Sequence, residues 1–347
     1  MTPELAIVGV MLVALVIYTL SAGADFGGGA WTLLASGKRA EDQRQLVDDA
    51  IGPIWEANHV WLILVVVLLF VCFPGAFAAA STALHVPLSV MLIGIVLRGS
   101  AFAFLHVYTH EEQAHDPVPR RFSRVFAVAS LITPVTLGVT LGALSTGIRV
   151  DTATGLVQTD FISEWLAPFP FAAGLFTLCL FAFLAAVYLA YEAQDTDPEL
   201  SEIFRRRALI SAALVFVTAL LAFLAALRGA PIIHTGLRAS AFALPLHLAT
   251  GVAAVLAIAL LWRRRLQAAR LAAMAQVALI VVGWALAQYP YLVFPDLTIA
   301  GAAAPRPVLV AVLVALAVGA VVLVPALVYL LVIFKRHRVG QRVDAGH

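Results

Sequence analysis

The stretch Pro53-Ile54-Trp55-Glu56-Ala57-Asn58-His59-Val60-Trp61 opens an apolar segment that continues to Phe73. Such a run predicts a membrane-spanning helix, yet its first turns carry a carboxylate, an amide and an imidazole. On a helix, Glu56 and His59 are three residues apart and Trp55 and His59 four apart, so these groups share a face. An ionisable group in hydrocarbon costs roughly several kcal/mol unless it is paired or hydrated. We therefore interpret the cluster as a functional site near one membrane surface; the alternative is an interfacial anchor in which Glu56 faces water.

The composition excludes a soluble protein. Of 347 residues, 62% are hydrophobic and 12% are charged, and the mean hydropathy is +0.98. A soluble domain this apolar would lack the polar surface that covers a core, so we expect an all-α polytopic membrane protein. Cys72 and Cys179 lie in apolar runs without a CxxC motif, which predicts neither a disulfide framework nor a metal site. No Lys or Arg precedes the first apolar run, so we expect that run to be retained as a helix.

Long apolar segments predict the architecture. At about 20 apolar residues per crossing, we expect about nine transmembrane helices. They would form a single integral membrane domain over residues 1–347, with one four-helix bundle in 1–143, a second in 165–289 and a peripheral helix at 307–334. The expected helices are 5–34, 54–73, 77–105, 122–143, 165–191, 208–228, 243–262, 271–289 and 307–334.

The basic residues are concentrated in alternate loops and in the C-terminal tail, whereas the opposite loops hold few. The positive-inside rule then places the N-terminus outside and the C-terminus in the cytoplasm, in agreement with an odd number of crossings. The residues expected on the cytoplasmic side are Lys38, Arg39, Arg44, Arg120, Arg121, Arg124, Arg205, Arg206, Arg207, Arg263, Arg264, Arg265, Arg270, Lys335, Arg336, Arg338 and Arg342. Those expected outside are Arg149, Arg228, Arg238 and Arg306.

This topology places three distant charged residues at one depth. Asp25 lies near the inner end of the first span, beside a Gly23-Gly27 step that lets another helix approach closely. Glu56 opens the second span and Arg98 closes the third at the same side. Together with Trp55, Asn58 and His59, we interpret these residues as a proton entry route, because burial can raise the pKa of a carboxyl group toward neutrality. The alternative is an ion pair of Arg98 with either acid that only locks three helices together.

Other chemistries have no support in the sequence. A haem needs axial ligands that face one pocket, and no pair among the nine histidines has a telling spacing. Metal-ligand clusters, nucleophile motifs, phosphate-binding loops and nucleic-acid patches are absent, so we expect no nucleic-acid partner. The runs Arg205–Arg207 and Arg263–Arg265 are typical positive-inside anchors, with contact to anionic membrane lipid as a secondary role.

Several motifs resemble subunit II of cytochrome bd-type quinol oxidases. The specific part is the first 110 residues, and the other matches follow in the family's order. The matching segments are Tyr18–Trp31 with its Gly-Ala-Asp-Phe-Gly-Gly-Gly, Gly52–Leu62, Leu97–Phe102, Ser130–Pro134 with Gly138 and Gly142, Tyr188-Leu189 and Tyr289–Val293.

The resemblance implies a haem-free scaffold subunit in the bacterial cytoplasmic membrane. Its partner, subunit I, would carry the b- and d-type haems and the quinol site, and the heterodimer would reduce dioxygen to water with protons from the cytoplasm. By motif position, Glu56 would be the acid of the proton route and Asp25 the second family acid. A structurally bound quinone and small single-span accessory subunits are further features that the resemblance allows.

The chain departs from the family pattern at three positions. Ala22 stands where the family often has Asp, and Ala103 and Leu105 replace a Glu and an Arg that would form a pair. This pattern indicates a divergent member and leaves its quinone type and partner contacts open. Two other functions also remain open from the residues alone: an ion-coupled secondary transporter and a haem-carrying oxidase subunit.

Overall fold

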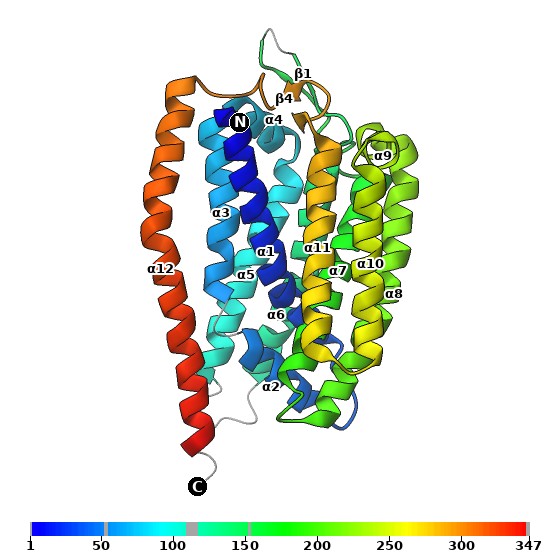
Figure 1. Ribbon diagram of the computed structural model, residues 1–347, viewed down its shortest axis with the longest axis vertical. Coiled ribbons are helices and arrows are strands. Elements are labelled where there is room, and N and C mark those ends of the chain that lie inside the picture. Colours follow the sequence, from blue (N-terminus) through cyan, green and yellow to red (C-terminus); the bar gives the residue numbers. More distant parts are fainter. Residues whose placement is uncertain (1, 52–54, 109–116, 152–153, 345–347) are drawn as a thin grey trace.

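The computed structural model describes residues 2–51, 55–108, 117–151 and 154–344, with only the backbone at 51, 55–57, 106–108, 117–120 and at most positions from 324 onward. Long helices stand side by side, with the first residues of α1 at one end and the last residues of α12 at the other (Figure 1). The expected all-α fold is confirmed, apart from two short antiparallel strand pairs.

Eight helices of the described residues are long and apolar enough to cross a membrane. A ninth crossing is obtained if α3 (Trp55–Cys72) and the short α4 (Pro74–Ala83) count as one bent span. The eight are α1 (Pro3–Leu33), α5 (His85–Tyr108), α6 (Pro117–Ala143), α7 (Pro168–Glu192), α8 (Pro198–Gly229), α10 (Ala243–Trp262), α11 (Leu266–Gln288) and α12 (Arg306–Asp344).

The predicted third span, 77–105, is wrong at its start. The chain bends by 116° between α3 and α4, and α5 begins only at His85. Phe73, at the bend, has a non-helical backbone, and the following Pro74 has no N–H to continue the hydrogen bonds of α3. One face of α4 is formed by small buried residues. These residues are Ala76, Ala79, Ala80 and Ala83. This short helix packs across the end of the bundle and is not part of the membrane crossing formed by α5.

Helix α1 is the centre of the packing. It contacts α3 and α6 and also α7 and α11, and therefore touches members of both predicted four-helix bundles. A Cβ added at Gly27 would collide with the carbonyl of Phe181, and one at Gly23 would come within 3.1 Å of Leu184. The close helix approach predicted from these two glycines is confirmed, and its partner is α7. The division into two bundles stays a prediction.

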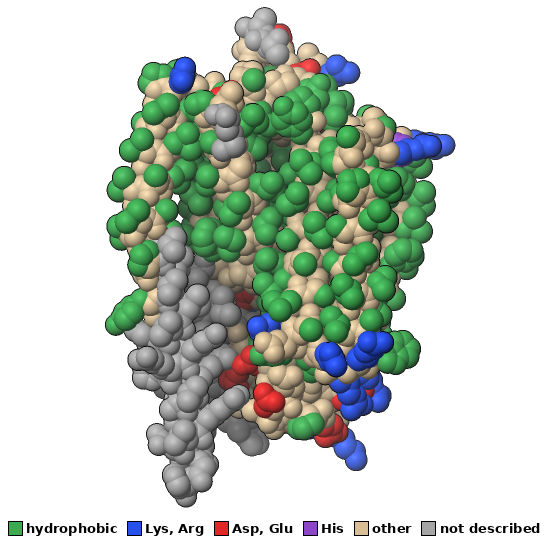
Figure 2. All heavy atoms as spheres, viewed as in Figure 1, with side chains coloured by type: hydrophobic (Ala, Val, Ile, Leu, Met, Phe, Trp, Pro, Cys, Tyr) green, Lys and Arg blue, Asp and Glu red, His purple; other side chains and the backbone are tan. Residues whose placement is uncertain are grey.

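The two ends of the bundle are built differently (Figure 1). One end holds α4, α9 (Pro231–Ala239) and the strand pairs β1–β2 (Arg149–Val150 with Val157–Gln158) and β3–β4 (Tyr291–Val293 with Leu297–Thr298). The other end holds the amphipathic helix α2 (Ala40–Ile51). The space-filling view shows a hydrophobic middle, with most blue side chains toward the α2 end (Figure 2).

Helix α12 stands at the edge of the molecule beside α3 (Figure 1). Its first turns pack on the core through the buried Leu309, whereas Val318, Val321 and Val322 are exposed. Such an apolar and exposed surface fits a helix that faces lipid or a partner subunit.

Candidate functional site

A buried ion pair lies between α1 and α5. The Arg98 guanidinium contacts both carboxylate oxygens of Asp25, with an Nη1 to Oδ2 distance of 2.9 Å, and Nη2 also donates to the Asp25 carbonyl oxygen at 3.2 Å. The side chains of Arg98 and Asp25 are 1% and 3% exposed. Since a buried charge needs a partner and full hydrogen bonding, this two-point contact explains how both residues can lie inside a membrane bundle.

Two further polar side chains connect this pair to neighbouring helices. Asn58, in the first turn of α3, donates from Nδ2 to Oδ2 of Asp25 at 3.3 Å. The Nε of Arg98 donates to the Ser130 hydroxyl of α6 at 3.0 Å, and that hydroxyl donates to the Phe126 carbonyl at 2.7 Å. The cluster therefore joins four helices, α1, α3, α5 and α6, through charge-assisted contacts.

Aromatic rings enclose the guanidinium. The Cζ atom of Arg98 lies 4.8 Å from the ring centroid of Phe26 and 4.7 Å from that of Phe126. The negative face of each ring is attracted to the cation, and both rings exclude solvent from the ion pair. The same Phe26 ring meets the His59 imidazole edge-on, with 6.4 Å between centroids.

The structure brings some of the predicted site residues into contact, whereas the side chains of others lie outside its described part. Asp25, Asn58 and Arg98 are in contact, and His59 is their neighbour through Phe26. Trp55 and Glu56 belong to the first turn of α3, but their side chains lie outside the described residues.

Two more polar atoms are buried near this cluster. Tyr18 precedes Asp25 by about two turns on the same face of α1 and is fully buried. His59 is partly buried. Neither the Tyr18 hydroxyl nor the His59 Nδ1 has a hydrogen-bond partner within the described part of the chain.

The depth of the ion pair follows from the bounds of its two helices. Helix α5 continues from Arg98 to Tyr108, about 15 Å, and α1 continues from Asp25 to Leu33, about 12 Å. The ion pair therefore lies inside the bundle, two to three turns from those helix ends. Asn58, in contrast, lies about one turn after the start of α3, so the opening of α3 is at the same depth as the pair.

A second polar network joins the loops at the α2 end. Arg39 forms ion pairs with Asp42, Asp197 and Glu199. Asp197 is also the N-cap of α8, accepting a hydrogen bond from the Leu200 N–H at 3.0 Å. Hydrogen bonding to the Arg39 guanidinium lowers the pKa of Asp197 to about 2. This network ties the loop after α1 to the loop before α8.

The described residues hold no group of three or more His, Cys, Asp or Glu side chains that would bind a metal ion. Two of the span histidines have local contacts: the Nδ1 of His247 contacts the Ala243 carbonyl at 2.6 Å and that of His85 the Thr82 carbonyl at 3.1 Å.

The sequence interpretation missed Ser130, Phe26 and Phe126 as parts of the site. The sequence held an indirect signal for Ser130, the glycine run that includes Gly29: in the structure, a Cβ at Gly29 would collide with the Ser130 hydroxyl. Glycine at that position allows α1 and α6 to approach until Ser130 reaches the ion pair. The aromatic residues carried no such signal, since Phe in a membrane span is ordinary.

Comparison with known proteins gives a consistent result. Residues 3–334 match the family model of the cytochrome bd terminal oxidase subunit II. The chain is 31% identical over 129 residues to the cytochrome bd ubiquinol oxidase subunit 2 of Bacillus subtilis (strain 168), covering 37% of this chain and 36% of that protein. It is 23% identical over 290 residues to the putative cytochrome bd menaquinol oxidase subunit II of the same organism, covering 82% and 81%.

A third relative is the cytochrome bd-I ubiquinol oxidase subunit 2 of Escherichia coli (strain K12), 26% identical over 185 residues. That match covers 53% of this chain and 46% of the relative, so two of these three matches span less than half of the relative's length. Among solved structures, the bd oxidase from Geobacillus thermodenitrificans shares the fold, with a TM-score of 0.76 and 23% identity over 96% of this chain and 99% of the other. The family match over nearly the whole sequence shows that the chain belongs to the cytochrome bd terminal oxidase subunit II family.

Proposed function

We propose that this chain is the haem-free subunit II of a terminal oxidase that couples quinol oxidation to the reduction of dioxygen to water. The match of residues 3–334 to the subunit II family carries the proposal. Its apolar helices and family make it an integral protein of the bacterial cytoplasmic membrane. The relatives are named as subunits of ubiquinol and menaquinol oxidases, which supports the same class of respiratory complex.

The redox centres are proposed to lie in the partner, subunit I, which would hold the b- and d-type haems and oxidise the quinol. The match to a subunit II family model supports this division of roles. The present chain would then act as scaffold and proton-delivering partner in a heterodimer. Small accessory subunits, bound membrane lipid and a structural quinone are further components that mass spectrometry of the purified complex would detect.

Proton uptake from the cytoplasm is the chemical role proposed for the cluster around Asp25. Glu56 and Asp25 are its acids, and Trp55, Asn58, His59 and Arg98 are its supporting residues. Because Arg98 and Asn58 already engage the Asp25 carboxylate, Asp25 would organise the site while Glu56 exchanges protons. The contact of Asn58 with Asp25 supports this assignment, since it holds the first turn of α3 against the ion pair.

The test of the function is purification of the chain alone and with its copurifying partners, followed by absorption spectra and quinol-driven oxygen consumption. The proposal expects no haem in the isolated chain, and b and d bands with oxygen consumption in the complex. Haem in the isolated chain would support the haem-carrying alternative. Substrate uptake by proteoliposomes that contain this chain alone would support the transporter alternative.

A further inference from the structure

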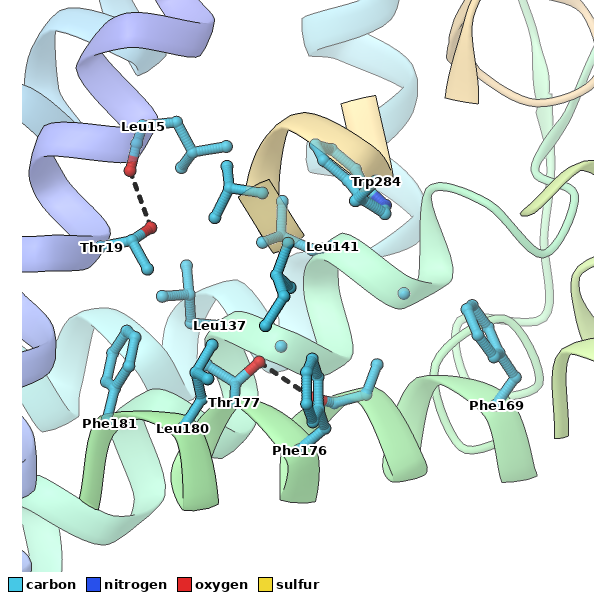
Figure 3. Close-up of a pocket in the computed structure, with 15 residues that line it drawn as sticks. Leu15, Thr19, Leu137, Leu141, Phe169, Phe176, Thr177, Leu180, Phe181 and Trp284 are labelled. Carbon is cyan, nitrogen blue, oxygen red and sulfur yellow. Dashed lines mark hydrogen bonds between the residues drawn. The ribbon is translucent and has the colours of Figure 1, made fainter. Parts of the chain in front are cut away.

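An apolar cavity of about 120 Å³ lies between α1, α6, α7 and α11, apart from the Asp25 cluster. Figure 3 shows Leu15 and Thr19 on one side, Leu137 and Leu141 in the middle, and Thr177 and Trp284 on other sides. None of the residues that line it carries a charge. The proton route described above uses none of them.

The polar hydrogens of the lining are already engaged. The Thr19 hydroxyl donates to the Leu15 carbonyl at 2.7 Å, and the Thr177 hydroxyl donates to the Ala173 carbonyl at 2.9 Å (Figure 3). The indole Nε1 of Trp284 donates to the Ser145 hydroxyl at 3.4 Å. A ligand in this cavity therefore gains contact with apolar atoms and finds no free donor.

This lining disfavours ligands with polar groups. A quinone headgroup would bury two carbonyl acceptors without donors, and a buried polar group left without a hydrogen bond costs about 1–3 kcal/mol. An enclosed apolar cavity of about 150 Å³ stays dry in another protein and binds benzene or xenon. The cavity here is of similar volume but partly open. The size and lining here thus fit a small molecule that needs no hydrogen bond.

The wall between α6 and α7 is held by close backbone contact. A Cβ at Gly142 would come within 2.9 Å of the Pro170 Cα, and one at Gly174 within 2.6 Å of the Val135 carbonyl oxygen. Because these two helices already touch along their backbones, they cannot move closer to fill the space. The wall of the cavity formed by α6 and α7 is therefore held in place by backbone contact.

We propose that this cavity binds small apolar molecules, and that dioxygen is the one it takes up in the membrane. The choice of dioxygen rests on the proposed function, because the oxidase complex would consume dioxygen that is dissolved in the apolar interior of the membrane. The cavity would hold dioxygen inside subunit II, separate from the reaction site in the partner.

Crystals of the complete oxidase complex pressurised with xenon test the site. We expect anomalous density for xenon between Leu141 and Trp284 in the wild-type complex and in Leu141→Met, which keeps the side-chain volume. In Leu141→Phe, the larger side chain occupies part of the cavity, so the xenon occupancy should fall at least severalfold. No xenon in the wild-type cavity, or an ordered lipid or quinone chain filling it, would overturn the inference.

Dioxygen itself is tested in the oxidised complex without quinol, so that no turnover occurs. With 5-fluorotryptophan incorporated, the ¹⁹F signal missing from a Trp284→Phe variant identifies Trp284. Raising the oxygen pressure should increase the relaxation rate of this signal severalfold more in wild type than in Leu141→Phe. Equal relaxation in both would refute dioxygen binding here. Both readouts are independent of oxidase activity, so failure of the proposed function would be recognised separately.

Discussion

At the scale of single residues, the Asp25–Arg98 pair is an ion pair buried inside the helix bundle. Its charges are almost fully buried, and each is satisfied by more than one partner. A buried pair of this kind contributes little compared with a well-packed apolar pair, but a lone buried charge is strongly destabilising. The pair therefore defines how α1 and α5 must meet.

We predict that Arg98→Met destabilises the assembled complex by about 3–5 kcal/mol, because Asp25 would remain as an uncompensated buried charge. The double variant Asp25→Leu with Arg98→Met should recover much of the loss, since both charges are then gone. Thermal unfolding of the purified complex measures this. Arg206→Met, whose side chain is 73% exposed, is the control and should change little. Wild-type stability of Arg98→Met would contradict the account.

The residue scale also shows how far the sequence could predict the site. Depth counted along spans was enough to bring Asp25, Asn58 and Arg98 together, because helix rise is regular. Which acid Arg98 pairs with depends on how helices are rotated against one another, and this rotation is set by side-chain packing such as Gly29 against Ser130. The ion pair that the sequence allowed between Arg98 and either acid is present with Asp25.

At the scale of helices, α1 packs against the backbone of α7 at Gly27. We predict that Gly27→Leu prevents assembly, because even a Cβ at this position would collide with the Phe181 carbonyl and lie 2.7 Å from the Ala185 Cβ. Gly9→Leu on the same helix is the matched control, since nothing lies within 4 Å of its added Cβ. The yield of assembled complex from membranes is the measurement, and equal yields for the two variants would speak against tight packing at Gly27.

The N-terminus of α8 gives a prediction with a defined pH dependence. Asp197 caps this helix and pairs with Arg39, so Asp197→Ala should cost about 1 kcal/mol or more at neutral pH. Its folded pKa of about 2 lies below the unfolded value of 3.8. The ionic part of this stability is therefore fully present above about pH 4 and is lost as the pH falls toward 2.

Melting temperatures of the complex between pH 7 and pH 3 check this pH dependence. The difference between wild type and Asp197→Ala should shrink as the pH falls below 4. The exposed Asp195, changed to Ala, serves as control and should show little difference at any pH. A wild-type advantage that grows toward acid pH would be inconsistent with the ion pair.

Helix boundaries illustrate which elements the sequence could predict. Crossings flanked by charged loops, such as α10 at 243–262, were predicted at the observed positions. The break between α3 and α4 was predicted at the Pro74-Gly75 pair, but the second break, between α4 and α5 at Leu84, was not, because hydropathy is continuous across it. The short α2, α4 and α9 were missed for the same reason: they pack on the ends of the bundle, and their apolar content does not distinguish them from loops or spans.

At the scale of the whole molecule, the proposed orientation places the α2 end in the cytoplasm. We predict that Leu156→Cys, between the strands β1 and β2, reacts with a membrane-impermeant maleimide in spheroplasts, whereas Arg206→Cys reacts only in inverted vesicles. Both positions are exposed, Leu156 by 68% and the Arg206 side chain by 73%. The wild-type chain, with its cysteines in the spans, is the background control. The reverse labelling pattern would invert the proposed topology.

The central claim is that an acid at the opening of α3 delivers cytoplasmic protons to the oxidase, and quinol-driven oxygen consumption by the purified complex tests it most directly. The account predicts that Glu56→Gln lowers the rate by about tenfold or more while haem content and assembly are retained, since shape is kept and proton exchange is lost. Glu41→Gln, at the same end of the molecule and 85% exposed, should keep the wild-type rate. An intact Glu56→Gln complex with wild-type oxygen consumption would contradict the claim.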